Sequence, residues 1–309
     1  MSVIEQAAKR LEELRRAGIG VPAHAAPTEN SSRSHLGDES GFLPTQPGPE
    51  TNVTAGRAPA TSSLSSPLMP DFEIDLSRLA AGGFVTPDMP RSRIADEFRI
   101  VKRPLIANAY AKGKAGIKNG NLIMVTSAMP GEGKTFSSVN LAMSLAMEMD
   151  RTVLLVDADV ARPSLPQVLG LPPTRGLLDA LDEKLLDISE LLSRTNVEKL
   201  TILTSGTQHP QATELLASDA MVNLLEALVT SDPDRIVIFD SPPLLVTTES
   251  RVLASQMGQI VFVVKAESTL QSDVKKALAT IEACPVKTIL LNQARTVAQG
   301  AYGYGYGYK

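Results

Sequence analysis

The sequence predicts an α/β fold with a mostly parallel sheet, helices on both faces and a disordered region ahead of it. Two observations predict this class. From about residue 71 onward, short segments rich in Val, Ile and Leu alternate with longer amphipathic segments, which is typical of strands joined by crossover helices. Residues 19–70 are instead rich in Pro, Ser, Thr, Gly and Ala, so they cannot bury enough apolar surface to offset the entropy of ordering.

Six segments are the expected strands of the sheet. Their continuous apolar character fits strands that are covered on both faces. They are Asn121–Ser127, Thr152–Asp157, Leu200–Thr204, Arg235–Asp240, Gln259–Lys265 and Lys287–Asn292. The expected crossover helices are Thr135–Met149, Thr213–Val229 and Leu270–Ala283.

Composition divides the chain into four parts. The expected parts are a short amphipathic helix at 1–18, a disordered linker at 19–70, a folded domain at 71–295 and a flexible tyrosine-rich tail at 296–309. The first helix has one narrow apolar seam at coiled-coil spacing, made by Ile4, Ala7, Leu11 and Leu14. Two heptads are too short for a stable isolated helix, so this segment is either a solvated helix or one that docks on a partner helix.

Bulk properties narrow the class of function. A net charge of −4 on 309 residues does not suggest binding to nucleic acid or another polyanion. The apolar runs are far shorter than the roughly 20 residues that a membrane-spanning helix needs, and the N-terminus does not resemble a secretory signal. Cys284 is the only cysteine, so no internal disulfide is possible and a reducing compartment, the cytoplasm, is expected.

A glycine-rich loop follows the first long apolar strand and leads into a helix. It reads Ala128-Met129-Pro130-Gly131-Glu132-Gly133-Lys134-Thr135, the pattern of a P-loop, and it predicts a P-loop NTPase fold. Glycines let the backbone turn its N–H groups toward phosphate oxygens, and the helix N-terminus adds positive potential. We expect Lys134 to reach the β- and γ-phosphates of ATP and the Thr135 hydroxyl to ligate Mg²⁺. The usual pattern has glycine at the place of Ala128, where another small residue still fits. The expected ATP-binding residues are Pro130, Gly131, Glu132, Gly133, Lys134, Thr135 and Phe136.

Two further strands end in aspartate. Asp157 and Asp159 follow one buried strand, with Arg162 just beyond, and Asp240 ends another. Ligands of open parallel sheets bind outside the carboxyl ends of the strands, where these carboxylates and the P-loop would meet. A single aspartate at a strand end is commonly only a helix cap. Three beside a P-loop favour a catalytic site.

Phosphoryl transfer gives these residues distinct roles. Lys134 and Mg²⁺ would neutralise charge, and Asp240 together with Asp159 would hold the metal with Thr135. A tyrosine hydroxyl, whose pKa is about 10, needs a nearby carboxylate to accept its proton at neutral pH. Asp157 is the favoured base, although the sequence does not decide between Asp157 and Asp159. Arg162 completes the expected catalytic set.

These motifs together resemble the bacterial tyrosine kinases of the CpsD/CapB type. The resemblance rests on the P-loop, Asp157-Ala158-Asp159-Val160-Ala161-Arg162-Pro163-Ser164, Phe239-Asp240-Ser241-Pro242-Pro243 and the tyrosine-rich tail, and it covers roughly residue 94 to the C-terminus. Within that family, the chain looks most like the autokinases found beside exosortase-linked exopolysaccharide operons. The resemblance implies a P-loop tyrosine kinase domain at 71–295 that uses ATP and Mg²⁺, with Asn292 near the adenine. It also implies regulation of exopolysaccharide synthesis or chain length, at the inner face of the membrane, through a separate membrane-bound activator.

The same family carries Glu-x-x-Arg-x-x-Arg on a helix before the P-loop, where it assembles a ring. Here the corresponding residues are Asp96, Arg99 and Lys102, which keep the charge signs but change two identities. Lysine does not reproduce the planar fork of arginine. Self-association through these residues is therefore one expectation, and a solvated charged helix face is the other.

The C-terminal tail is the expected substrate. Tyr302, Tyr304, Tyr306 and Tyr308 are four of the five tyrosines in the chain, separated by single glycines. Beside a kinase-like site they are expected to be autophosphorylated, largely in trans. The competing interpretations are an edge strand with every tyrosine on one face, and a low-complexity adhesive tail.

Two other functions remain open on sequence. Partitioning ATPases of the ParA/MinD group share the fold, but they carry a signature lysine at the place of Met129 and have no use for a tyrosine tail. A non-catalytic ATP-binding scaffold for polysaccharide assembly is the second alternative, and the presence of Lys134, Thr135 and three aspartates argues against it.

Overall fold

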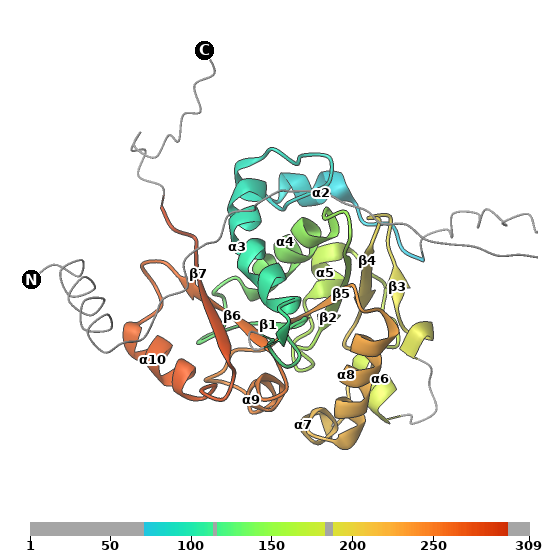
Figure 1. Cartoon of the computed structure of the whole chain (residues 1–309), viewed down its shortest axis with the longest axis vertical. Helices are drawn as coiled ribbons and strands as arrows, with labels where there is room; N and C mark the ends of the chain where they lie inside the picture. The colour runs from blue at the N-terminus through green and yellow to red at the C-terminus, as the bar shows by residue number, and fades with distance from the viewer. Residues whose placement is uncertain (1–70, 114–115, 183–187, 296–309) are drawn as a thin grey trace, which may run out of the picture. The chain divides into compact units, whose positions relative to one another are not determined.

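The computed structural model describes residues 71–113, 116–182 and 188–295 (Figure 1). The segments expected to form the N-terminal helix at 1–18, the linker at 19–70 and the tail at 296–309 lie outside these residues. No helix in the described ranges combines the length and apolar character needed to cross a membrane.

One seven-stranded sheet forms the centre of the fold, in the order β3-β4-β2-β5-β1-β6-β7. All neighbouring strands are parallel except β3 and β4, which are antiparallel. The strands are β1 (Leu122–Ser127), β2 (Thr152–Asp157), β3 (Ser193–Arg194), β4 (Leu200–Leu203), β5 (Arg235–Asp240), β6 (Gln259–Lys265) and β7 (Val286–Asn292). The predicted, mostly parallel sheet is confirmed.

Helices cover both faces of this sheet, as predicted (Figure 1). One face packs on α2 (Leu76–Ala81), α3 (Arg93–Ala109), α4 (Lys134–Ala146) and α5 (Leu165–Leu169). The other packs on α6 (Leu177–Asp182), α7 (Ala212–Leu216), α8 (Asp219–Ser231), α9 (Glu249–Ala254) and α10 (Gln271–Ala279). A single-turn 3₁₀ helix spans Ile188–Glu190. Successive residues of β1 point to opposite faces of the sheet. Met124 therefore packs in the core on one face and Val125 in the core on the other.

Strand ends agree closely with the sequence expectations, and helix ends agree less well. The strands β2, β5 and β6 have the predicted bounds. The prediction of one helix over Thr213–Val229 is wrong, because the chain ends α7 at Leu216 and begins α8 at Asp219. Ser218 between them is extended, with ψ 163°, and its hydroxyl donates to the Leu215 carbonyl. Serine side chains that bond the local backbone in this way favour helix ends over helix interiors.

The segment 71–92 is fastened to the sheet and to α4. The Asp71 carboxylate and the Arg194 guanidinium form a two-point ion pair across to β3, with Nη2 3.0 Å from Oδ1. Farther along, the Val85 amide donates to Oδ1 of Asn140 at 2.6 Å, and both residues are buried. These contacts tie the first described residues to the sheet and to α4.

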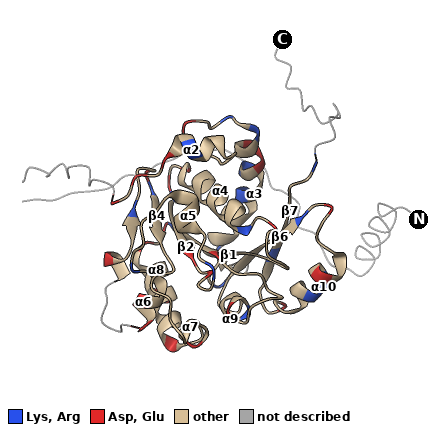
Figure 2. Cartoon of the chain, turned by 180° about the vertical axis from the view of Figure 1, so that it is seen from behind, with Lys and Arg blue, Asp and Glu red and all other residues tan. Residues whose placement is uncertain are grey.

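Helix α3 carries acidic and basic side chains together (Figure 2). Asp96 and Arg99 pair with each other on its exposed side, and Arg99 also donates to the Pro90 carbonyl at 2.9 Å. Lys102 does not share that surface. Its side chain is buried, lies 2.7 Å from a carboxylate oxygen of Glu148 and donates to the Ser144 carbonyl. The expectation that Lys102 contributes to a subunit contact is therefore corrected: its charge is used to hold α3 against the end of α4.

Replacement of Glu148 by alanine is expected to lower the free energy of unfolding by about 2 to 4 kcal/mol, because it leaves the Lys102 ammonium buried without its counter-charge. The matched control is Glu97→Ala, which breaks the exposed Arg93–Glu97 pair on the same helix. That change is expected to cost less than about 0.5 kcal/mol. Urea denaturation of both variants measures the difference. Equal losses would contradict the structural role given to Lys102.

Candidate active site

The P-loop joins β1 to α4 at the carboxyl end of the central strand. Ala128 is fully buried where the loop leaves the sheet, which accounts for a small residue at this position. Gly131 and Gly133 have φ values of 78° and 95°, a conformation that glycine adopts without strain. Lys134 is the first residue of α4 and Thr135 the second. Sequence and structure therefore agree on the position of the phosphate-binding turn.

Glu132 has a role that the sequence did not reveal. It was expected among the ATP-binding residues, but its side chain is buried and directed into the protein. One carboxylate oxygen accepts the Met129 amide at 2.9 Å, and the other accepts the Thr269 hydroxyl. Its backbone carbonyl accepts the side-chain amide of Asn292 at 3.0 Å. The side chain of Glu132 thus braces the loop from within and leaves only its backbone for a phosphate.

Asn292, at the end of β7, packs directly on the P-loop. A Cβ atom added at Gly133 would lie 2.0 Å from the side-chain nitrogen of Asn292. The positive φ favours glycine at position 133, and a side chain there would also displace the Asn292 amide from the loop. The contact places the end of β7 beside the P-loop.

Two aspartates face each other across neighbouring strands at the same edge. Asp157 of β2 is in register with Asp240 of β5, and both side chains are fully buried. Asp157 accepts backbone amides from Leu165 at 3.1 Å and from Asp159 at 3.3 Å. Asp240 accepts the Ser138 hydroxyl at 2.9 Å through Oδ1. The predicted convergence of the P-loop and the acidic strand ends is present.

Burial makes these carboxyl groups unusually basic. Burial, and next the charge of Asp240, raise the pKa of Asp157 to about 8. Burial also raises the pKa of Asp240 to about 6, although the hydroxyls of Thr135 and Ser138 and the charge of Lys134 act in the opposite direction. Such displaced pKa values are typical of catalytic sites, where a carboxyl must exchange a proton near neutral pH.

Asp159 and Arg162 lie nearer the solvent. Asp159 is half-buried, and burial raises its pKa while the charge of Lys134 lowers it. Its carboxylate accepts the Arg162 amide at 3.2 Å. Arg162 is exposed, so this contact shapes the turn after β2 and leaves the guanidinium at the surface. The three aspartates thus span a path from the buried edge of the sheet outward.

The donor set fits a magnesium ion held together with a nucleotide. Asp240 Oδ2 is buried without a hydrogen-bond partner among the described residues. Nearby, the Thr135 hydroxyl bonds the Ser164 hydroxyl at 2.6 Å. Within the same ranges no group of three or more His, Cys, Asp and Glu could hold a metal alone. Magnesium in nucleotide sites usually takes one or two protein oxygens, and water and phosphate supply the rest.

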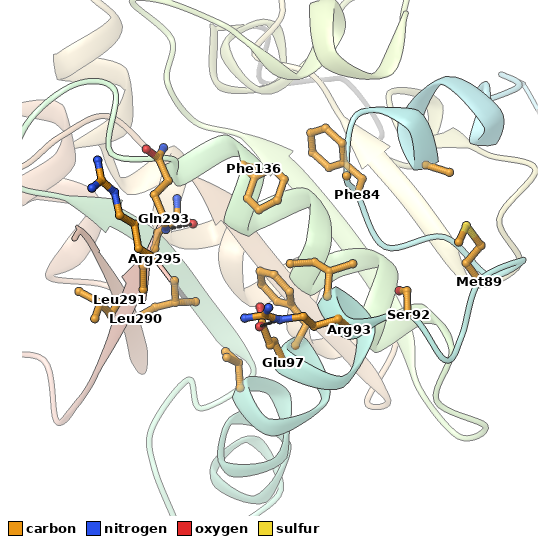
Figure 3. A pocket seen from close by; sticks show the side chains of 17 residues that line it. Phe84, Met89, Ser92, Arg93, Glu97, Phe136, Leu290, Leu291, Gln293 and Arg295 are labelled. Atoms are coloured by element: carbon orange, nitrogen blue, oxygen red, sulfur yellow. Dashed lines mark hydrogen bonds and ion pairs between the residues drawn. The ribbon is translucent and has the colours of Figure 1, made fainter. Parts of the chain in front are cut away.

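A groove of about 940 Å³ adjoins the P-loop (Figure 3). We call it the α3–β7 groove, because α3 and β7 form its walls. Its apolar lining includes Phe84, Ile94, Phe98, Val101, Phe136 and Leu290. Phe136 follows Thr135 on α4, and its ring lies 4.9 Å from that of Phe84, centroid to centroid. Asn292 lines the P-loop end of the groove.

Comparison with known proteins places the chain in a family. A family model described as "ParA: NUBPL iron-transfer P-loop NTPase" matches residues 118–298. The chain is also 31% identical, over 223 residues, to the tyrosine-protein kinase YwqD of Bacillus subtilis (strain 168). That alignment covers 71% of this chain and 89% of YwqD. The chain belongs to the bacterial tyrosine-protein kinases.

Solved structures show the same family relationship for this chain. The kinase domain of the Escherichia coli tyrosine kinase ETK matches with a TM-score of 0.59 at 26% identity, covering 72% of this chain and 86% of that domain. The chimerical protein CapA2B2 matches with a TM-score of 0.57 at 27% identity, covering 70% of this chain and 92% of the chimera. Both matches support a kinase-type enzyme built on a P-loop NTPase domain.

The structure adds three hydroxyl residues to the candidate site of this kinase. Ser138 bonds Asp240, Ser164 bonds Thr135, and Thr269 bonds Glu132. Ser138 could have been found from the sequence, because it lies one helical turn after Lys134 and faces the same edge. Ser164 and Thr269 carry no sequence signal of their own, since only the tertiary fold brings them to the loop.

Proposed function

We propose that this chain is an ATP-dependent protein-tyrosine kinase that phosphorylates its own C-terminal tail, largely in trans, from one copy of the chain to another. The acceptor residues are Tyr302, Tyr304, Tyr306 and Tyr308. One observation carries the proposal: Lys134 of the P-loop lies at the sheet edge where the carboxyls of Asp157, Asp159 and Asp240 converge. The similarity to tyrosine-protein kinases over most of YwqD supports the choice of tyrosine as acceptor.

The residues divide the work of phosphoryl transfer. The P-loop amides and Lys134 would hold the phosphates of ATP. Thr135, Asp240 and Asp159 would hold Mg²⁺, which would supply positive charge to offset that of the transferring phosphate. A substrate tyrosine oxygen forms a bond to the γ-phosphorus while the bond from that phosphorus to ADP breaks. The phenolic proton passes to the carboxylate of Asp157. With a pKa near 8 in the nucleotide-free protein, Asp157 is ionised only in part at neutral pH, and its ionised form accepts that proton more readily than an ordinary aspartate does.

Asn292 and Phe136 are the proposed residues beside the nucleotide base. Both line the end of the α3–β7 groove next to the P-loop. Asn292 already donates one N–H to the loop, so its position is fixed before the nucleotide arrives. The ring of Phe136 offers an apolar face on which a base can stack.

A mixing experiment tests the kinase and the trans step together. A Lys134→Met chain that keeps its four tail tyrosines is incubated with an active chain whose four tail tyrosines are Phe, in ATP and Mg²⁺. Phosphotyrosine is expected on the Lys134→Met chain, detected by mass spectrometry of its tail. If phosphotyrosine forms only on active chains that carry their own tail tyrosines, and never on the Lys134→Met chain, the transfer occurs in cis.

The same assay separates the alternatives. A partitioning ATPase of the ParA/MinD type would hydrolyse ATP without forming phosphotyrosine, and a non-catalytic scaffold would bind ATP with neither outcome. Absence of phosphotyrosine from wild-type chain under all conditions, including addition of membrane fractions from the source cell, would refute the kinase proposal.

The biological setting is also proposed. Control of exopolysaccharide synthesis or chain length, through a separate membrane-bound activator, is the role that the family resemblance supports. Self-association into a ring would use the exposed Asp96 and Arg99 of α3. Phosphates on the tail would repel one another and the acidic site, so the assembly should become smaller after ATP addition. Light scattering before and after phosphorylation measures this, and an unchanged mass with a fully phosphorylated tail would contradict it.

A further inference from the structure

The outer edge of the sheet beside the groove is open. β7 is seven residues long and, within the described chain, pairs only with β6. Its other edge therefore presents backbone N–H and C=O groups that no described strand pairs. Edge strands of this length are usually blunted by charges, Pro or bulges. Here Ile289 and Leu291 are 57% and 60% exposed on one face, and only Lys287 adds a charge.

The opposite face of β7 opens into the α3–β7 groove. Leu290 is half-buried there (Figure 3). Ile94 and Val101 of α3 also line the groove. The P-loop end, at Phe136 and Asn292, is the part assigned above to the nucleotide base. The remaining part, between α3 and β7, is an apolar space beside an unpaired strand edge. A segment with apolar side chains at every second position fits such a place, because one face of an added strand would fill the groove.

The chain itself supplies such a segment. Residues 302–308 alternate tyrosine and glycine, so an extended backbone puts all four rings on one face. This stretch matches the seven residues of β7 in length. Tyrosine also suits the groove chemically, because its ring is apolar and its hydroxyl can remain at the wet rim.

The point where the tail begins favours it over other occupants. Arg295, the last described residue, lines the groove and forms an ion pair with Glu267, with 3.5 Å between Nε and Oε2. Residues 293–301 would then turn the chain back toward β7. Attachment at this distance gives the tail an effective concentration of about millimolar, which neither a second copy nor a separate partner has at ordinary protein concentrations.

We propose that the unphosphorylated Tyr-Gly tail docks on its own chain as an eighth strand, antiparallel to β7, with its tyrosine rings in the α3–β7 groove. In this register Tyr302 lies opposite Asn292 and Tyr304 opposite Leu290. Docking holds the tyrosines in the groove until the tail is released, and Tyr302, opposite Asn292, overlaps the end of the groove assigned above to the nucleotide base. A phosphate would add about −1.5 to −2 charges to a ring, and burying that charge against the apolar walls of the groove is costly, although Arg93 and Arg295 line the groove together with Glu97.

This inference does not rest on the kinase proposal, and its test uses no nucleotide. The chain has no tryptophan and five tyrosines, so a Tyr110→Phe background leaves the four tail tyrosines as the only strong emitters. Acrylamide quenching of the full-length chain then reports their exposure. Val101→Glu places a charge in the groove and is expected to raise the quenching constant about twofold or more. The matched control is its neighbour Ile100→Glu, whose side chain is 76% exposed and should change nothing. Equal quenching in all three chains would overturn the docking.

A disulfide test checks the register and does not depend on Val101 variants folding normally. Leu290→Cys is combined with Tyr304→Cys in the full chain, and the buried native Cys284 is kept in all versions. Mild oxidation is expected to give an intrachain disulfide in this pair, and much less in a control that combines Tyr304→Cys with Met149→Cys, a position 86% exposed in the turn after α4. Equal yields in the two pairs would show an undocked tail. A disulfide mainly between chains would overturn docking in cis in favour of a second copy as the occupant.

Discussion

Replacement of Lys134 by methionine is expected to lower tyrosine phosphorylation by about a hundredfold to a thousandfold, because it removes the one cation that faces the phosphates from the P-loop. The charge of Lys134 also lowers the pKa values of Asp159 and Asp240. Its loss should therefore make both carboxyls harder to ionise and weaken the magnesium site as well. Phosphotyrosine formation and ATP turnover, measured on the same preparation, should fall together.

The control for this change is Lys276→Met, which removes an exposed lysine on α10. It should leave phosphorylation unchanged. Circular dichroism and the unfolding midpoint confirm that both variants fold. Autophosphorylation that persists in the Lys134→Met chain would end the assignment of this loop as the phosphate site.

Replacement of Asp157 by asparagine is expected to stabilise the nucleotide-free protein while it disables the chemistry. The folded protein raises the pKa of Asp157 from its ordinary value of 3.8 to about 8. Between these values the unfolded chain has lost the proton and the folded chain keeps it. The contribution of Asp157 to stability therefore falls as pH rises from about 4 to about 8, by up to roughly 1.4 kcal/mol per pH unit.

Asparagine does not ionise, so the Asp157→Asn variant does not lose this stability as pH rises. The difference in unfolding free energy, variant minus wild type, should grow with pH and level off above the folded pKa. Denaturation without Mg²⁺ or nucleotide, at several values between about pH 5 and pH 9, measures it. Asp159→Asn is the control, because Asp159 is only half-buried and should show the same sign with a smaller slope. Parallel curves for wild type and Asp157→Asn would contradict the raised pKa.

The same Asp157→Asn chain tests the role of this residue in catalysis. Loss of a general base should reduce phosphoryl transfer about 10²- to 10⁴-fold. Affinity for the nucleotide should remain closer to normal, because the base acts on the transition state more than on bound ATP. Losses of equal size in binding and transfer would make Asp157 chiefly a metal-site residue, and Asp159 would become the candidate base.

The strands and the P-loop were predictable because local sequence determines them. A run such as Val153–Val156 has no polar position, so it can only be a strand covered on both faces. Gly131 and Gly133 mark backbone conformations that few other residues adopt. The break between α7 and α8 was missed, since Ser218 is a weak local signal in a long helical pattern. Its effect depends on how both short helices pack on the sheet.

The roles of charged side chains were less predictable, because they depend on partners far along the chain. The position of Lys102 in a helical motif indicated a surface contact, but Glu148 and the Ser144 carbonyl draw it inward. Glu132 stands inside a nucleotide-binding motif, yet the folded chain uses its side chain to join Met129 to Thr269. Neither partner is visible from sequence spacing. Asp157 and Asp240 were placed correctly because strand ends bring them together by topology alone.

The bracing of Glu132 has a consequence for the order of synthesis. Its two distant partners, Thr269 and Asn292, follow it by 137 and 160 residues, so the ribosome adds them long after the P-loop itself. A nascent chain that has emerged only as far as β5 already contains the whole glycine-rich motif and all three aspartates. It still lacks the contacts that hold the loop in shape, and β1 still has one unpaired edge where β6 belongs. The contacts that hold the P-loop in shape are therefore among the last in the domain that can form during synthesis.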